Sequence, residues 1–66
     1  MEDLLTVRQT ARFMAVSQPY IYKLVNAGRL PCVIFQGISE GGRPKRVIRF
    51  EKDKLIEFIE QRRVNY

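Results

Sequence analysis

The sequence has 66 residues, enough for one small domain over 1–66, and its 45% hydrophobic content argues against disorder. Twelve lysines and arginines against seven acids give a net charge of +5, a balance typical of proteins that bind a polyanion. One cysteine and no histidine exclude an internal disulfide and argue against a zinc site or histidine-based catalysis.

The first predicted element is a short helix. Thr6 and Gln9 have the spacing of a capping box, in which each side chain bonds the other residue's backbone N–H. Apolar residues then recur with helical spacing at Val7, Ala11 and Met14, and Phe13 widens this stripe. We therefore expect a helix over roughly 7–14.

A second helix follows after the three residues 15–17. Ser17 is a suitable N-cap, Pro19 is tolerated because it falls in the first turn, and Gly28 supplies a left-handed end. The apolar face of this helix comprises Ile21, Leu24 and Val25. Two helices at this separation predict a helix-turn-helix over about 6–28.

A β-hairpin is predicted over about 32–50. It is expected to have strands at 32–36 and 45–50 around a glycine-containing loop at 37–44. This loop is too long for a tight two-residue turn. In the second strand, alternation predicts that Ile48 and Phe50 face the core.

The last predicted element is a helix over about 51–62. Its apolar stripe consists of Leu55, Ile56, Phe58 and Ile59. Acidic residues come early and arginines late, which complements the helix dipole. The element order is α-α-β-β-α, an α+β fold.

The second helix is the first candidate binding element. With its apolar residues turned inward, Gln18, Tyr20, Tyr22 and Lys23 are left outward or beside the core. These side chains can hydrogen-bond to base edges or phosphates, and the second helix of a helix-turn-helix enters the major groove. On periodicity alone, a solvated helix face is an equally good interpretation.

The hairpin is the second candidate. Residues 40–50 carry four bases and one acid, and Arg43, Lys45 and Arg46 are placed to bind successive phosphates. Neutralising about five phosphates would give log K against log salt a slope of roughly −4 to −5. The alternative is a sheet edge protected by charge. The helix-turn-helix beside it favours the phosphate interpretation.

Three further arginines are weaker candidates. Arg8 and Arg29 could add phosphate contacts at the ends of the two helices, although such arginines are more often simply exposed. For Arg49, a DNA contact and a salt bridge to a neighbouring acid are equally compatible with its outward position on the strand.

Residues 4–60 resemble the excisionase family of MerR-like winged helix-turn-helix DNA-binding domains. The resemblance is most specific from "VSQPYIYKLVNAGRLP" (16–31), and "RFEKDKLIEFI" (49–59) agrees as well. It implies a recognition helix in the major groove and a wing against the backbone or minor groove. By position, the groove-facing residues are Ser17, Gln18, Tyr20, Tyr22 and Lys23, and the wing residues are Arg43, Lys45 and Arg46. Ala15, where the family often has glycine, and the long loop 37–44 depart from the family pattern.

MerR regulators carry a long dimerisation helix and an effector domain that this sequence lacks, so the resemblance favours an excisionase. Such a protein binds and bends double-stranded DNA with a cognate integrase, with possible cooperative contacts between adjacent protomers. A small phage or plasmid transcriptional regulator is the alternative, and an adaptor for an acidic protein is a third hypothesis. No catalytic set, metal cluster or cofactor motif is present, and without a signal peptide or membrane span we expect a cytoplasmic protein.

Overall fold

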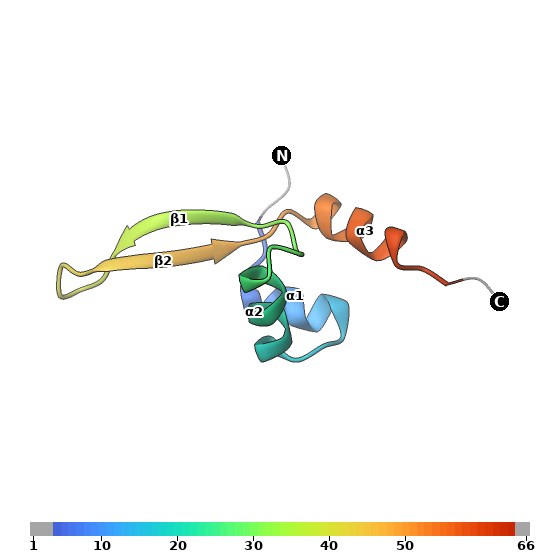
Figure 1. Ribbon diagram of the computed structural model, residues 1–66. Helices are drawn as coiled ribbons and strands as arrows, with labels where there is room; N and C mark the ends of the chain where they lie inside the picture. Colours follow the sequence, from blue (N-terminus) through green and yellow to red (C-terminus); the bar gives the residue numbers. More distant parts are fainter. Residues whose placement is uncertain (1–3, 65–66) are drawn as a thin grey trace.

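The computed structural model describes residues 4–64 and contains three helices and one two-stranded sheet within that range. In chain order the elements are α1 (Val7–Met14), α2 (Gln18–Asn26), β1 (Val33–Ile38), β2 (Pro44–Arg49) and α3 (Lys52–Gln61) (Figure 1). The predicted α-α-β-β-α order and the α+β class are confirmed, and the architecture is that of a small winged helix-turn-helix.

Both helices of the helix-turn-helix begin at the predicted caps. At α1, the Gln9 backbone N–H donates to Thr6 Oγ1 at 3.0 Å, and the Thr6 N–H donates to Gln9 Oε1 at 2.9 Å, which completes the capping box. At α2, the Tyr20 backbone N–H donates to Ser17 Oγ at 3.3 Å, and Pro19 lies within the first turn. Local sequence therefore determines where each helix starts.

Both helices also end in the same way, with a Schellman motif built around a left-handed residue. After α2, Gly28 has φ +69°, and the next N–H, of Arg29, donates to the Leu24 carbonyl at 2.9 Å. After α1 the left-handed residue is Ala15, with φ 59° and ψ 42°, and the Val16 N–H donates to the Ala11 carbonyl at 2.9 Å. The turn is thus as tight with alanine as a glycine would make it, at the expense of backbone strain.

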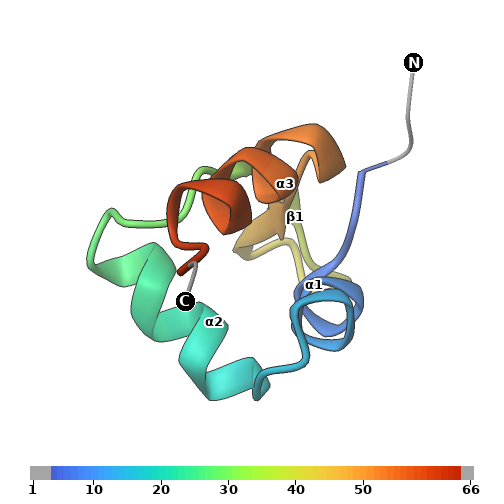
Figure 2. The ribbon, with the colours of Figure 1, turned by 90° about the vertical axis from the view of Figure 1, so that its right-hand side faces the viewer.

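The core is formed where the three helices meet the base of the hairpin (Figure 2). Its buried apolar residues are Val7, Ala11, Ile21, Leu24, Leu30, Phe50, Leu55 and Phe58. Phe50 is fully buried and Ile48 packs partly against the cluster, as the strand alternation predicted. Among the described residues, Thr10 is the buried polar side chain, and its hydroxyl makes no hydrogen bond within residues 4–64.

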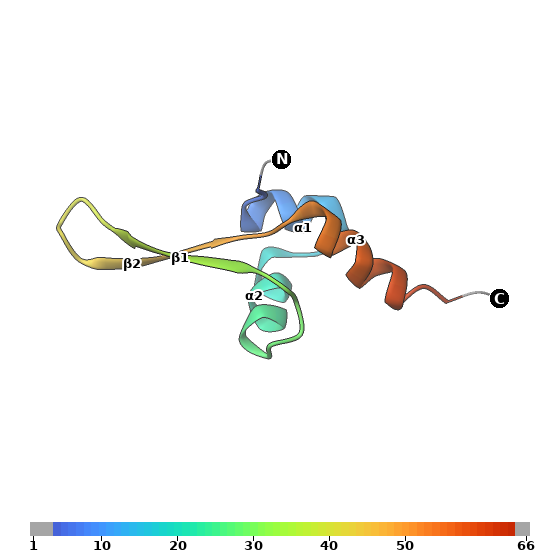
Figure 3. The same ribbon diagram turned by 90° about the horizontal axis from the view of Figure 1, so that it is seen from above.

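The hairpin projects from α1 and α2 on one side and α3 extends on the other, and the molecule measures 52 × 27 × 19 Å (Figure 3). β1 and β2 are antiparallel, with Val33 opposite Arg49 and Ile38 opposite Pro44. The predicted loop at 37–44 was too long, because Gly37 and Pro44 continue the strands and only residues 39–43 form the turn. Proline is compatible with the first position of a strand, and the glycine faces Lys45 across the ladder.

Two residues predicted in apolar stripes are exposed, Phe13 of α1 and Ile56 of α3. Ile56 was placed in the apolar stripe of α3, but its side chain is 45% exposed. Leu55 and Phe58 are buried on the inner side of α3, and so small a fold provides no element to cover the neighbouring position. The helix ends at Gln61, where the Arg62 guanidinium stacks 3.5 Å from the centroid of the Phe58 ring and Nη1 donates to the Phe58 carbonyl at 3.2 Å.

Candidate nucleic-acid interface

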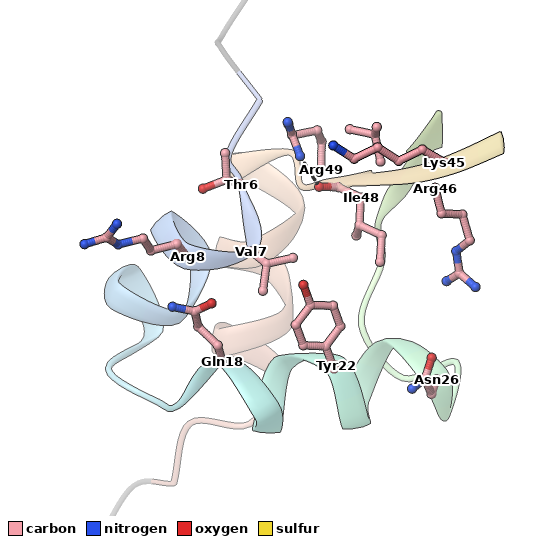
Figure 4. Close-up of a pocket in the computed structure, with 11 residues that line it drawn as sticks. Thr6, Val7, Arg8, Gln18, Tyr22, Asn26, Lys45, Arg46, Ile48 and Arg49 are labelled. Atoms are coloured by element: carbon pink, nitrogen blue, oxygen red, sulfur yellow. Dashed lines mark hydrogen bonds between the residues drawn. The ribbon is translucent and has the colours of Figure 1, made fainter. Parts of the chain in front are cut away.

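A groove of about 560 Å³ lies between α2 and β2, with the start of α1 at one end (Figure 4). It is open to solvent and mixes polar with apolar surface, unlike a closed substrate pocket. The residues that line it are Thr6, Val7, Arg8, Gln18, Tyr22, Asn26, Lys45, Arg46, Val47, Ile48 and Arg49. We call this surface the basic groove.

From α2, the basic groove receives one stripe of polar side chains. Gln18, Tyr22 and Asn26 are spaced four residues apart, so they project from the same side of the helix, as Figure 4 shows. Ile21 and Leu24 are buried on another side of α2, which fixes the rotation of the helix about its axis. The stripe presents two amides and one phenol, groups that can both donate and accept hydrogen bonds.

Asn26 was not among the predicted site residues. The signal was present in the sequence, because Asn26 follows Tyr22 by four residues just as Tyr22 follows Gln18. In a helix-turn-helix, base contacts come mainly from the N-terminal part of the second helix, and Asn26 is the last residue of α2.

Four cations surround this stripe. Arg8 comes from the first turn of α1, and Lys45, Arg46 and Arg49 come from β2. The Arg49 guanidinium is held at the base of the hairpin, because Nη1 donates to the Ile48 carbonyl at 2.7 Å. The structure thus places Arg49 in the groove, and within residues 4–64 it makes no salt bridge with a neighbouring acid.

The four cations are not matched by acids within the described residues. The salt bridges found between residues 4 and 64 both lie on or just after α3, joining Lys54 to Glu57 at 3.8 Å and Arg63 to Glu60 at 3.0 Å. Glu57 and Glu60 of α3 therefore pair with bases on or just after the same helix, away from the groove. The positive potential of the groove stays available to an external anion.

A short β-bridge positions α1 beside the hairpin. The Leu5 N–H donates to the Phe50 carbonyl at 2.8 Å, and the Phe50 N–H donates to the Leu5 carbonyl at 2.9 Å. Because α1 begins two residues after Leu5, this bridge places Arg8 next to β2. It also ties the wing to the helix-turn-helix at a buried residue, so the two halves of the groove keep their relative positions.

The remaining predicted residues lie outside the basic groove. Tyr20 and Arg29 line a second groove of about 400 Å³ between α2 and α3, away from the Gln18 stripe. Lys23 is exposed on α2, Arg43 is exposed in the turn of the hairpin, and the Ser17 hydroxyl caps α2. Of the predicted set, the structure thus brings together Arg8, Gln18, Tyr22, Lys45, Arg46 and Arg49. Their contacts with DNA stay predictions.

Residues 4–64 hold no group of three or more histidine, cysteine, aspartate or glutamate side chains arranged to bind a metal ion. In the same part of the chain, no helix has the length and hydrophobicity needed to cross a membrane.

Of the comparisons with known proteins, the one with protein families gives a match, and it agrees with the geometry of the site. No curated protein and no solved structure matches the chain significantly. A family model described as a helix-turn-helix domain matches residues 4–63, nearly the whole sequence. Domains of this family bind DNA and are typically not enzymes. The chain therefore belongs to the helix-turn-helix domain family, and its partner is DNA.

Proposed function

We propose that this protein is an excisionase that binds and bends attachment-site DNA, and so promotes integrase-mediated excision of a mobile element. The observation that carries the DNA-binding part is the basic groove, in which a stripe of hydrogen-bonding side chains on α2 is surrounded by four cations. The excisionase part is supported by the resemblance of residues 4–60 to that family. The protein does no covalent chemistry in this role and needs no cofactor.

In this proposal α2 enters the major groove. A helix with its side chains is about 10–12 Å across, which matches a major groove about 12 Å wide. Gln18 can bond adenine through two hydrogen bonds, and Tyr22 and Asn26 can bond neighbouring base edges. Arg8 then meets a phosphate at one end of the helix.

The wing supplies affinity. Lys45 and Arg46 lie on β2 and both line the basic groove, with their side chains on opposite faces of the strand, where the phosphate backbone flanking the major groove would run. Phosphate contacts fix the register of a protein on the duplex but carry no direct sequence information. Arg43 extends this row of cations to the far end of the hairpin.

Bending follows from engaging the duplex at two separated places. The six-residue strands carry the end of the wing roughly 20 Å from the helices, so α2 and the wing can hold phosphates at two separate places on the duplex. Bending a short site costs on the order of 1–6 kcal/mol, and several protomers on adjacent sites could supply this together. The cognate integrase is the second proposed partner, and the role places the protein in the cytoplasm.

The alternative is a small phage or plasmid transcriptional regulator that uses the same surface. Footprinting on the genomic DNA that flanks the protein's gene separates the two roles. Protection of an attachment-site arm beside integrase sites supports the excisionase, and protection over a promoter supports the regulator.

A reconstituted reaction tests the excisionase role directly. Purified integrase, the protein and a plasmid carrying both attachment sites are incubated, and excised circles are quantified. The wild type and Ile56→Ala, an exposed substitution outside the basic groove, are expected to stimulate excision equally. Gln18→Ala with Asn26→Ala should abolish stimulation. No stimulation by the wild type, with DNA binding intact, would reject the excisionase role.

A further inference from the structure

The far end of the hairpin exposes apolar side chains. Ile38 is 78% exposed, and it lies directly opposite Pro44 across the ladder. Residues directly opposite each other in an antiparallel pair project from the same face, so these two side chains form one apolar pair. We call Ile38, Pro44 and the turn 39–43 the wing tip.

The wing tip has a defined conformation. The Ser39 N–H donates to the Arg43 carbonyl at 2.9 Å, and the Gly42 N–H donates to the Ser39 carbonyl at 2.9 Å. Gly42 has φ +78°, which a residue with a side chain adopts only under strain. The turn therefore presents the apolar pair on a closed end of the ladder, where it is positioned before any partner arrives.

Polar groups flank the pair on the same face. Gln36 lies opposite Arg46, two positions nearer the helices, and alternation places this pair on the face of Ile38 and Pro44. Amide and guanidinium groups are the side chains that read the minor groove. Residues 36–46 carry three bases and one acid, Glu40, so the surroundings of the apolar pair attract a polyanion.

We propose that Ile38 and Pro44 act as an apolar wedge that enters the minor groove and partly unstacks one base step. This inference rests on the proposed DNA binding and gives the bend a structural cause. Isoleucine and proline are among the wedges that minor-groove proteins insert, and such wedges kink the duplex by roughly 20–90°. Arg43, Lys45 and Arg46 bind the flanking phosphates, and Gln36 meets the base edges beside the opened step.

The reach of the wing fits this position. Each strand of six residues extends roughly 20 Å at about 3.3 Å per residue, enough to pass from a helix in the major groove across one phosphate backbone. The apolar pair at the end of the hairpin is then the part of the wing that arrives at the adjacent minor groove. An acidic protein is the competing occupant of the wing tip, and an acidic peptide is the second probe of the test.

The test measures bending separately from binding. The probe is a 40-base-pair duplex with the site that the wild type selects from random-sequence DNA, with a donor and an acceptor dye at its ends. The variants are Ile38→Ala, Ile38→Leu, which keeps an apolar wedge, and the matched control Ile56→Ala on α3. All substituted side chains are exposed or nearly half-exposed, so their thermal unfolding curves should match the wild type.

The wild type, Ile38→Leu and Ile56→Ala are expected to bend the duplex, and 2-aminopurine at the opened step should brighten. Ile38→Ala should still bind but lose about half of the bend or more, and this brightening should disappear. A mismatch at the step removes part of the unstacking cost, so the wild type should bind the mismatched duplex roughly tenfold tighter, and Ile38→Ala should show little gain.

The other outcomes overturn either the wedge or the proposed function. If the wild type bends DNA and Ile38→Ala bends it equally, the wedge is rejected and DNA binding stands. If Ile38→Ala instead loses only binding to an acidic peptide or to a second copy of the chain, the tip is a protein-docking surface and the wedge is again rejected. If the wild type selects no DNA site at all, the proposed function itself fails.

Discussion

Removing single cations from the basic groove should change the salt dependence of DNA binding by a predictable amount. The four lining cations and Arg43 at the end of the hairpin give five phosphate contacts, and about 0.9 per contact predicts a slope near −4.5 for log K against log salt. Between 50 and 200 mM salt this slope lowers the affinity about 500-fold. With Lys45→Ala the slope should be near −3.6, and the loss over the same range about 150-fold.

The measurement is a titration of labelled duplex by fluorescence anisotropy at five salt concentrations, repeated with an unrelated duplex. Lys45→Ala and Arg46→Ala should each reduce the slope on both duplexes, because phosphate contacts do not depend on sequence. Lys54→Ala is the control, since Lys54 lies on α3 and makes only an exposed pair with Glu57. An equal change of slope in Lys54→Ala, or no change in Lys45→Ala, would refute the placement of DNA in the basic groove.

Three further predictions follow from named residues. Gln18→Ala should cost about 1–3 kcal/mol of discrimination at one base pair in a binding-site selection, whereas Tyr20→Ala, which lies on the second groove, should leave the selected sequence unchanged. Ala15→Gly should raise the free energy of unfolding by about 0.5–1 kcal/mol in urea titrations. Glycine relieves about 1–2 kcal/mol of left-handed backbone strain, but it loses about 0.4–1 kcal/mol because the unfolded chain becomes more flexible. A lower urea midpoint for this variant would contradict the reasoning. Thr10→Val should stabilise the fold by about 1–2 kcal/mol and so raise the thermal midpoint, because it removes a fully buried hydroxyl that has no partner within residues 4–64. A lower thermal midpoint would indicate that the hydroxyl bonds to a group outside that range.

Local signals were sufficient for the helices, because their ends depend on neighbouring residues. Thr6 with Gln9, Ser17 and Gly28 form the caps and turns that their spacing predicts. Signals that depend on distant contacts were less reliable. Whether Ile56 is covered depends on what packs over α3, and periodicity within α3 contains no information about that.

In the hairpin and the site too, features set by neighbouring residues could be predicted, and features set by distant contacts could not. Glycine and proline normally interrupt strands, so the strands predicted from the sequence stopped before Gly37 and began after Pro44. Cross-strand pairing sets the register of the hairpin and continues the ladder through both residues. Within α2, helical spacing alone separates Gln18 and Tyr22 from Tyr20, which is two residues from each and projects elsewhere. That distinction was available from the sequence, but which stripe faces the wing depends on how α2 packs.

The size of the interface limits what one copy of this domain can do. A single DNA-binding module buries roughly 600–1,000 Å² of protein surface, and this protein exposes 5545 Å² in all, so one face of the molecule is enough for one site. That face presents three side chains to base edges, and at about 1–3 kcal/mol each they give modest discrimination against the many competing sites of a genome. The cations add affinity for every duplex alike. Selectivity for one locus must then come from bending, from neighbouring protomers or from a partner already bound there, and an excisionase acting beside an integrase combines these three sources.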